Sequence, residues 1–425
     1  PARRSVDNPL DVPELEAFKA QLKGSGERAA STTMGFVRLL STLTKDKAIG
    51  ERVVPIVPDE ARTFGMEGMF RQLGIYSSVG QRYTPQDSGQ IMFYKEDIKG
   101  QILQEGINEA GAFSAWLAAA TSYSTSDFPM VPFYIFYSMF GFQRIGDLAW
   151  AAGDSQARGF LIGATSGRTT LNGEGLQHED GHSQLLASTI PNCISYDPTY
   201  AYELAVIIQD GLRRMFRDCE NKFYYITTLN ENYPQPEMPK GVEEGILRGM
   251  YSLRRATRSE GPCVQLLGSG AILREVEAAA EILANDYDVS AETWSVTSVN
   301  ELFREGRAAR RWNLLHPEDE PRVPYVTGLL AGTRGPVVMA TDYIAGYAEQ
   351  LRAFIPSRYV VLGTDGFGRS DTRAKLRSFF EVSREFVVLA ALHALVEEGT
   401  LERDVLLTAR RNLGIDPDKI DPTLG

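Results

Sequence analysis

Val53-Val-Pro-Ile-Val57 and Phe133-Tyr-Ile-Phe-Tyr137 are short apolar runs of the kind that forms buried strands. Two further runs of the same character occur at Gly159–Gly163 and Phe223–Thr227. Residues with helical spacing precede the first run at about 27–43 and lie between later runs at about 100–120 and 200–217. Short apolar strands that alternate with helices predict a mainly parallel sheet covered by helices, which is the α/β class.

The same alternation recurs in the last part of the chain. Strands are predicted at Val264–Leu267, Trp294–Thr297, Tyr359–Leu362 and Phe386–Ala390, with a helix at Ala271–Asn285. The intervening stretch Asn230–Pro239 holds Pro234, Pro236 and Pro239, which prevent it from continuing a helix or a central strand. We therefore predict one α/β domain at 27–238 and a second at 239–425, each with a doubly wound sheet.

Residues 1–26 are predicted to be a linker. Its opening, Pro1-Ala-Arg-Arg-Ser-Val-Asp-Asn-Pro9, is charge-rich and starts without methionine. This pattern is typical of a cut inside a longer protein, so we expect a preceding domain that this chain lacks.

Composition narrows the class of function. The chain has 425 residues and a formal net charge of -11, with no block of basic residues, so binding to nucleic acid or to an anionic membrane is not expected. Its most apolar stretch, Phe128–Phe142, is shorter than the roughly 20 residues of a membrane-spanning helix. The three cysteines form neither a close pair nor a zinc spacing, which favours free thiols and a cytoplasmic location.

The string His178-Glu-Asp-Gly-His182 matches the H-E-x-x-H zinc motif. That motif works on a helix, and Gly173, Gly175 and Gly181 disfavour a helix here. The prediction is therefore no metal site, although a zinc hydrolase built on His178 and His182 is kept as an alternative. A loop that holds two of only four histidines is still a candidate functional segment.

Gly268-Ser-Gly270 follows a predicted strand and opens a helix, where main-chain amides could hold a phosphate. Leu273 stands where the third glycine of a dinucleotide-binding loop would be. The pattern favours a tight structural turn over a dinucleotide site.

Three acidic residues are candidates for chemistry. Glu109 lies in a stretch of small and apolar residues, and periodicity alone does not decide between an ordinary helix carboxylate and a buried functional one. Burial would raise its pKa and suit a group that shares a proton with a ring nitrogen. Asp59 and Glu60 directly follow a predicted strand, either as active-site groups at the edge of a parallel sheet or as helix caps.

The stretch Tyr134–Phe142 is rich in aromatic residues and is followed by Gln143 and Arg144. These aromatics could form a sheet core or could flank a flat heterocycle, and Arg144 could be structural or anion-binding.

Five long strings together resemble the homodimeric type of pyruvate dehydrogenase component found in bacteria, and the resemblance runs over nearly the whole chain. They are Pro58-Asp-Glu-Ala-Arg-Thr-Phe-Gly65, Glu105-Gly-Ile-Asn-Glu109, Tyr137-Ser-Met-Phe-Gly-Phe-Gln-Arg-Ile-Gly-Asp147, the segment Ser166–Ser183, and Leu362-Gly-Thr-Asp-Gly-Phe-Gly-Arg-Ser-Asp371. The resemblance implies a transketolase-like fold, with this chain supplying the pyrimidine-binding domain and the carboxy-terminal domain. No G-D-G string occurs in the chain. The diphosphate and magnesium site is therefore expected in a missing amino-terminal half.

The resemblance also implies residue roles toward thiamine diphosphate. Glu109 resembles the glutamate that hydrogen-bonds the aminopyrimidine, and Tyr137 and Phe140 resemble the aromatic residues packed against that ring. His178 resembles a histidine near the reacting group, and Asp59 and Glu60 resemble the acidic pair close to cofactor and substrate. Arg144 and His182 are further candidates around the site.

The implied function is oxidative decarboxylation of pyruvate, with the acetyl group passing to the lipoyl group of an acyltransferase component. The implied partners are the missing amino-terminal half, a second copy of the chain in a homodimer, and that acyltransferase. The alternatives are another 2-oxo acid dehydrogenase, a transketolase, or a catalytically silent half used for dimerisation and docking.

Overall fold

The structure is a computed structural model, and it describes residues 9–58, 61–86, 89, 94–172, 175–256, 258 and 260–424. Two compact units emerge from the contacts within the chain. The first comprises Pro1–Ser166, Leu186–Ser195 and Tyr200–Pro239, and the second comprises Gly167–Leu185, Tyr196–Thr199 and Lys240–Gly425.

A six-stranded sheet forms the centre of the first unit, with strand order β5-β2-β6-β7-β9-β8. Its pairs β5–β2, β2–β6, β6–β7 and β7–β9 are parallel. The strands are β2 (Val53–Val57), β5 (Leu103–Gln104), β6 (Val131–Tyr137), β7 (Phe160–Ala164), β8 (Cys193–Tyr196) and β9 (Phe223–Thr227). The predicted strands near 53–57, 133–137, 159–163 and 223–227 are confirmed.

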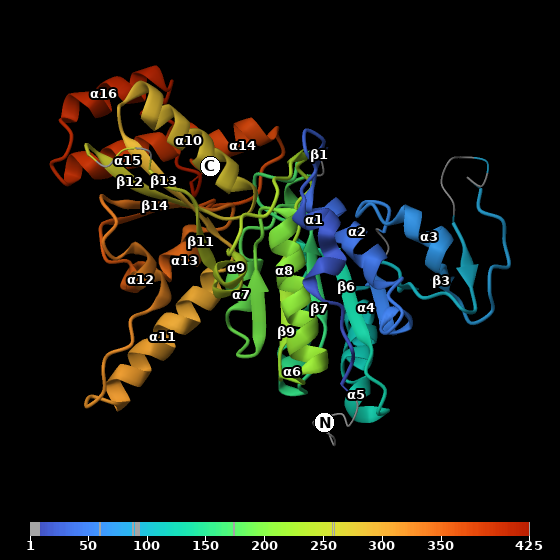
Figure 1. The fold of residues 1–425 in the computed structure, drawn as a ribbon. Helices are drawn as coiled ribbons and strands as arrows, with labels where there is room; N and C mark the ends of the chain where they lie inside the picture. The colour runs from blue at the N-terminus through green and yellow to red at the C-terminus, as the bar shows by residue number, and fades with distance from the viewer. Residues whose placement is uncertain are drawn as a thin grey trace. The chain divides into compact units, whose positions relative to one another are not determined.

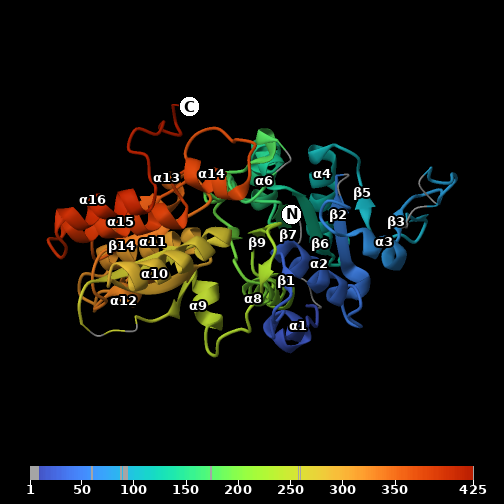
Figure 2. The ribbon, with the colours of Figure 1, turned by 90° about the horizontal axis from the view of Figure 1, so that it is seen from above.

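Helices cover both faces of this sheet. Figure 2 shows α4 and α6 on one side of β2, β6 and β7, and α1, α2 and α8 on the other. The helices of this unit are α1 (Lys19–Leu22), α2 (Thr32–Leu43), α3 (Glu67–Leu73), α4 (Glu109–Ala120), α5 (Ser122–Thr125), α6 (Phe142–Asp154) and α8 (Ala201–Leu212). Two short pairs of strands complete it, β1 (Ala29–Ala30) with β10 (Tyr233–Pro234) and β3 (Ile75–Tyr76) with β4 (Glu96–Asp97).

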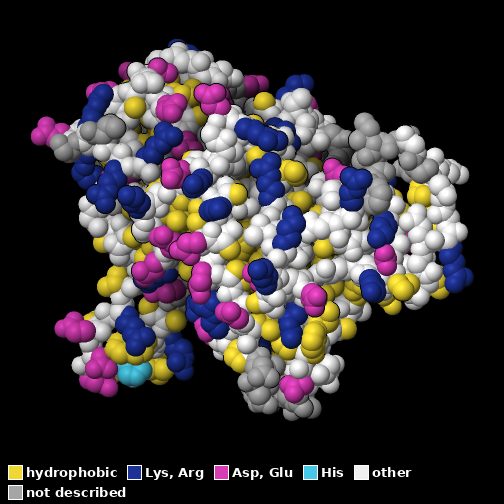
Figure 3. Space-filling model, turned by 45° about the vertical axis from the view of Figure 1, so that its right-hand side comes forward, with side chains coloured by type: hydrophobic (Ala, Val, Ile, Leu, Met, Phe, Trp, Pro, Cys, Tyr) yellow, Lys and Arg dark blue, Asp and Glu magenta, His cyan; other side chains and the backbone are white. Residues whose placement is uncertain are grey.

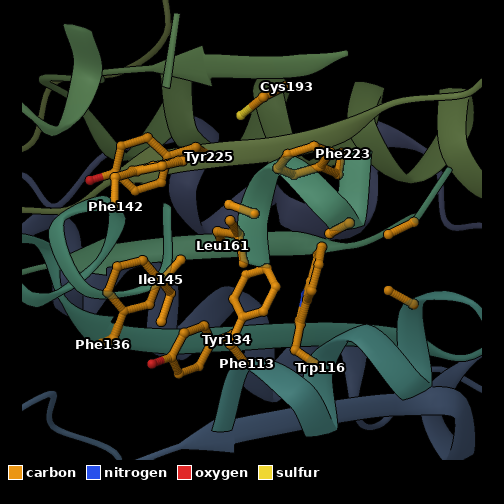
Figure 4. Packing of buried hydrophobic residues seen from close by; sticks show 14 of the residues in the cluster. Phe113, Trp116, Tyr134, Phe136, Phe142, Ile145, Leu161, Cys193, Phe223 and Tyr225 are labelled. Atoms are coloured by element: carbon orange, nitrogen blue, oxygen red, sulfur yellow. The ribbon is translucent and has the colours of Figure 1, made fainter. Parts of the chain in front are cut away.

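An aromatic core joins α4 and α6 to the sheet (Figure 4). Trp116 of α4 is fully buried, lies 5.0 Å from Phe113 and 5.9 Å from Phe223 between ring centroids, and donates its indole N–H to the Phe160 carbonyl at 3.1 Å. Tyr134 and Phe136 of β6 stack at 4.5 Å in the same cluster. Helix α4 is thereby anchored on the sheet through its middle.

Two predicted helices begin later than the sequence pattern indicated. Helix α2 starts at Thr32 rather than near residue 27, because Ser31 caps it by accepting a hydrogen bond from the Met34 amide. Helix α4 starts at Glu109 rather than near residue 100, since the residues before it form strand β5 and a turn in which Gly106 has φ +81°. A residue with positive φ interrupts a helix or strand, and the spacing of apolar residues alone does not reveal where such a residue lies.

The second unit has a five-stranded mixed sheet with the order β11-β13-β12-β14-β15. Strands β13, β12, β14 and β15 are parallel, and the edge strand β11 pairs antiparallel with β13. The strands are β11 (Met250–Arg254), β12 (Cys263–Gly268), β13 (Ser290–Val296), β14 (Val337–Ala340) and β15 (Tyr359–Leu362). With the first sheet, this confirms the predicted mainly parallel α/β class.

Figure 1 shows α10, α15 and α16 above this sheet and α11, α12 and α13 below it. The helices associated with the second unit are α7 (Ser183–Ala187), α9 (Glu243–Arg248), α10 (Leu273–Asp286), α11 (Val299–Leu315), α12 (Tyr325–Leu330), α13 (Ala345–Glu349), α14 (Arg373–Phe379), α15 (Arg384–Glu397) and α16 (Arg403–Asn412).

The predicted strand at Phe386–Ala390 is wrong, because these residues lie inside helix α15. A short apolar run does not distinguish a strand from a segment of a helix that is apolar on most sides. Here the run continues without glycine or proline to Glu397, long enough for a helix. Among the strands that the prediction missed are β8, β11 and β14, the last of which begins directly after Gly335 and Pro336.

Charged side chains of both signs are interspersed on the face drawn in Figure 3. Within the described residues, no helix has both the length and the apolar character needed to cross a bilayer. Cys193, Cys219 and Cys263 are all free thiols, as predicted.

Candidate functional site

The carboxyl ends of β5, β2 and β6 lie at one edge of the first sheet, since these neighbouring strands are parallel. Tyr137 ends β6, and Phe140 lies in the short turn of 3-10 helix that follows it. Glu109 is the first residue of α4, and Arg144 lies in the first turns of α6. The carboxyl edge of a parallel sheet is the usual place for ligand-binding groups in α/β proteins.

The structure brings these four candidates into contact. An Arg144 Nη1 lies 2.5 Å from Glu109 Oε1, and the Arg144 guanidinium lies 3.9 Å above the Phe140 ring centroid. The Phe140 and Tyr137 rings meet edge to face at 6.0 Å between centroids. Arg144, which the sequence left as structural or anion-binding, is thus the ionic partner of Glu109.

Burial distinguishes the two members of this ion pair. The Glu109 side chain is 12% exposed, whereas the Arg144 side chain is 48% exposed. A guanidinium that is half in solvent contributes little net stability through its ion pair. A mostly buried carboxyl group beside the buried Tyr137 ring and the partly buried Phe140 ring can hydrogen-bond a nitrogen of a flat ring.

Local structure also holds Glu109 in place. Asn108 caps α4 by accepting a hydrogen bond from the Gly111 amide at 3.0 Å, and Glu109 occupies the first turn, where the helix dipole favours a negative charge. The helix that begins at Glu109 is the same helix that Trp116 anchors on the sheet, so the cap and the anchor both fix the position of Glu109.

We expect Asn108→Ala to lower the free energy of unfolding by about 1 kcal/mol, because removal of the capping side chain leaves the Gly111 amide without its hydrogen-bond partner. Urea unfolding followed by circular dichroism measures this. Asn108→Ser keeps a capping oxygen and serves as the matched control. Equal losses for the alanine and serine variants would show that the cap contributes nothing.

Asp59 and Glu60, the predicted acidic pair, lie outside the described residues. They directly follow Val57 and Pro58 at the end of β2 in the sequence. Their placement near cofactor and substrate stays a prediction.

His178 and His182 fall in the segment Gly167–Leu185, which belongs to the second unit, whereas Glu109 belongs to the first. His178 ends a short 3-10 turn (Leu176–His178), and His182 precedes α7. The two histidines do not share an α-helix, so the geometry of the H-E-x-x-H motif is not formed. In the part of the chain that the structure describes, no three His, Cys, Asp or Glu residues are grouped to hold a metal ion.

Buried hydrogen bonds set the shape of this histidine-bearing segment. Asp180 is fully buried and accepts the amides of His182 and Ser183, each at 3.0 Å. Burial opposes its ionisation, but the hydrogen bonds from His182 and Ser183 outweigh it and hold the pKa of Asp180 below its ordinary value.

Sequence reasoning missed Arg168 and Asp342 as participants in this region. Asp342 follows β14 and accepts hydrogen bonds from the Thr169 amide, the Thr169 hydroxyl and the Thr170 hydroxyl at 2.8, 2.7 and 2.5 Å. The Arg168 guanidinium donates to the carbonyl of Thr364 at 3.0 Å and also to that of Gly366. Arg168 lay inside a quoted motif and could have been singled out, whereas Asp342 had no signal because β14 itself was missed.

The Gly268-Ser-Gly270 turn is filled by the protein itself. The Gly270 amide donates to the Asp197 carbonyl at 3.2 Å, and the Thr199 hydroxyl donates to the Gly270 carbonyl at 2.8 Å. A side chain at Gly270 would meet the Asp197 carboxylate. An acidic group at this position disfavours phosphate, which confirms the interpretation of the sequence as a structural turn.

Comparison with known proteins identifies two matching regions. Residues 10–236 match the Pyruvate dehydrogenase E1 component middle domain, and residues 249–383 match the Transketolase-like TK C-terminal domain. The Pyruvate dehydrogenase E1 component of Pseudomonas aeruginosa is 66% identical over 99% of this chain and 48% of its own length. Those of Cupriavidus necator and Escherichia coli K12 are 61% and 60% identical over 99% and 98% of this chain, and 47% of their own lengths.

Solved structures show the same fold at low sequence identity. Transketolase from Leishmania mexicana matches with a TM-score of 0.64 at 15% identity, over 90% of this chain and 48% of its own. A split-gene transketolase, described as an inactive beta4 tetramer, matches with a TM-score of 0.55 at 14% identity, over 86% of this chain and 98% of its own. The fold is therefore transketolase-like, as predicted.

The middle-domain model covers more than half of the chain, and it does so over the strings that carried the resemblance in residues 58–183. The chain spans about half the length of the curated relatives it matches. The chain matches this middle domain and the transketolase-like carboxy-terminal domain, and its relatives are about 60% identical or more. It therefore belongs to the pyruvate dehydrogenase E1 component family.

Proposed function

We propose that this chain supplies the pyrimidine-binding half of a thiamine diphosphate site, in an enzyme that decarboxylates pyruvate oxidatively and acetylates the lipoyl group of an acyltransferase. The observation that carries the proposal is the Glu109 carboxylate, held at the carboxyl edge of the first sheet beside Phe140 and Tyr137 in a chain of this family.

The residues at this edge fit the pyrimidine end of the cofactor. Bound thiamine diphosphate supplies the electron sink for decarboxylation. Glu109 would hold a proton at a carboxylate oxygen facing the ring nitrogen, while Tyr137 and Phe140 flank the ring. Arg144, which contacts both Glu109 and Phe140, would orient the carboxylate for this contact.

The diphosphate and Mg²⁺ are proposed to bind in the half of the relatives that this chain does not span. The split-gene transketolase, described as inactive, extends over nearly the same portion of the fold as this chain. We extend that property to this chain and propose that it is inactive without the missing half.

The remaining site residues complete the proposal. His178 would give or take a proton near the substrate, and Asp59 and Glu60 would lie close to cofactor and substrate, with at least one of them protonated or hydrogen-bonded beside the anionic pyruvate. His182 would support the loop of His178. The proposed partners are the missing half, a second copy of the chain and the acyltransferase, and the free thiols favour a reducing compartment such as the cytoplasm.

Calorimetric titration tests the divided site. We expect thiamine diphosphate with Mg²⁺ to bind the chain alone weakly, and to bind the complex of the chain with the diphosphate-binding half at least 100-fold more tightly, a difference of about 2.7 kcal/mol. Glu109→Gln should weaken binding to the complex less than it weakens turnover, since the diphosphate contacts stay. Equal binding by the chain and by the complex would refute the divided site.

A further inference from the structure

Two of the sequence strings in this chain, Ser166–Ser183 and Leu362–Asp371, contact each other within the second unit, to which the first string belongs from Gly167 onward. The Glu179 carboxylate accepts a hydrogen bond from the Arg369 amide at 2.7 Å, across 190 residues of sequence. Arg168 donates to the carbonyls of Thr364 and Gly366 from the same string. None of the roles assigned above explains the string Leu362–Asp371.

The packing at this junction leaves little room. Glu179 and Arg168 are each 2% exposed. A side chain at Gly368 would collide with the Leu176 carbonyl and crowd Glu179, and one at Gly181 would collide with the Arg168 guanidinium. The close approach of Gly368 to the Leu176 carbonyl leaves no space for a side chain where the two strings meet, whereas the contact at Gly181 lies within the first string.

The histidine-bearing segment is held from several directions around Glu179. The Glu179 and His178 amides close the 3-10 turn on Leu176 and Gly175 at 3.3 and 3.2 Å. Two residues further on, the Gly181 carbonyl accepts the Ile344 amide at 2.8 Å. Among these anchors, Glu179 supplies a side-chain hydrogen bond to the string Leu362–Asp371 and directly adjoins His178 in sequence.

We propose that Glu179 is a positioning residue, whose hydrogen bond to the Arg369 amide holds the loop of His178 against the string Leu362–Asp371. The functional part of this inference rests on the proposed function, in which His178 works near the substrate. The structural part, that Glu179 determines where His178 lies, does not depend on it.

The surroundings of Glu179 favour its neutral form. Burial, together with the nearby Asp342, raises the pKa of the Glu179 carboxyl to about 8 against the opposing effects of the Arg369 amide and the Arg168 guanidinium. Asp180 and the two histidines lie on the same segment, and Asp365 faces Arg168 from the opposite string. A neutral carboxyl still has an oxygen that accepts the Arg369 amide hydrogen bond.

The sign of the resulting pH dependence follows from this raised pKa. Between the ordinary glutamate pKa near 4.5 and about 8, the folded chain keeps a proton that the unfolded chain has lost. The contribution of Glu179 to stability therefore falls as the pH rises through this window. Glutamine carries no such proton but keeps the carbonyl acceptor, so Glu179→Gln should remove this dependence.

Urea unfolding at pH 5, 7 and 8.5 tests the buried carboxyl. We expect Glu179→Gln to gain stability relative to wild type progressively as the pH rises. Glu318→Gln, at an exposed glutamate of the same unit, is the matched control and should show a constant difference. A constant difference for Glu179→Gln as well would overturn the assignment of a neutral buried carboxyl.

Histidine-selective NMR of the chain tests the positioning itself. The chain has four histidines, and His→Gln variants assign their signals. We expect Glu179→Ala to shift or broaden the signals of His178 and His182, to leave those of His316 and His393 unchanged, and to be rescued by Glu179→Gln. Unchanged His178 signals in a folded Glu179→Ala variant would overturn the proposal.

Turnover of pyruvate by the assembled enzyme tests the functional consequence. Glu179→Ala is expected to lower kcat by roughly 10- to 100-fold, because misplacing a reacting group by about 1 Å has costs of this order. Glu179→Gln should restore most of the kcat and change its pH profile near pH 8. If the NMR signals move while turnover does not, Glu179 still positions His178, and the role given to His178 in the proposed function is the part that fails.

Discussion

Glu109→Gln is expected to lower the kcat of the assembled enzyme by roughly 10²- to 10⁴-fold, the usual contribution of one positioned proton-transfer group. Glutamine fills nearly the same volume and can still contact the Arg144 guanidinium through its carbonyl oxygen, but it cannot hold the proton that the proposed function assigns to Glu109. Pyruvate-dependent turnover with saturating thiamine diphosphate and Mg²⁺ measures the loss.

The controls separate chemistry from folding. Glu51→Gln, at an exposed glutamate of the same unit, should keep near-wild-type turnover. The urea unfolding midpoint of Glu109→Gln should stay close to that of the wild type, because its partner Arg144 is half in solvent and the ion pair contributes little to stability. Turnover within two-fold of wild type would refute the role of Glu109 in cofactor activation.

Trp116→Ala is expected to destabilise the first unit by about 3–5 kcal/mol, the range for removing a large buried aromatic side chain. Trp116 is fully buried between Phe113 and Phe223, and its loss also leaves the Phe160 carbonyl without the indole donor. Urea unfolding followed by tryptophan fluorescence and circular dichroism measures the change.

Helix α4 links this core residue to the site. Because Trp116 anchors α4 and Glu109 begins it, Trp116→Ala should also reduce turnover in enzyme that is still folded. Trp150→Ala in α6 is the matched control, since that side chain is 53% exposed and its removal should change stability by no more than about 0.5 kcal/mol. Equal effects of the two alanine variants would contradict the assigned anchor.

Several buried strands that were short, β-branched or aromatic, and bounded by turn residues could be predicted from the sequence, although β14, which has the same character, was missed. The strand Val53–Val57 and the strand Tyr359–Leu362 have the bounds that the sequence indicated. The failure at Phe386–Ala390 has a physical cause, since α15 buries Val387, Val388 and Leu392 on one side and carries further apolar residues on the other. Such a helix lacks the periodic contrast on which sequence interpretation depends.

The residues of the candidate site could be predicted from the sequence, but the contacts among them could not. Glu109, Tyr137, Phe140 and Arg144 were found in the sequence because they lie in strings of a known family, and the structure shows the contacts among them. The catalytic roles of these residues and of His178, His182, Asp59 and Glu60 stay predictions.

Local strings and apolar spacing encode the α/β class and the family directly, and they single out Glu109 as a candidate site residue. The pairing of Arg144 with Glu109, and the hydrogen bond from the Arg369 amide to Glu179 across 190 residues, are seen only in the folded structure. Such contacts join residues that lie far apart in the sequence, and they depend on how the folded chain pairs its polar groups. No local pattern in the sequence carries that information.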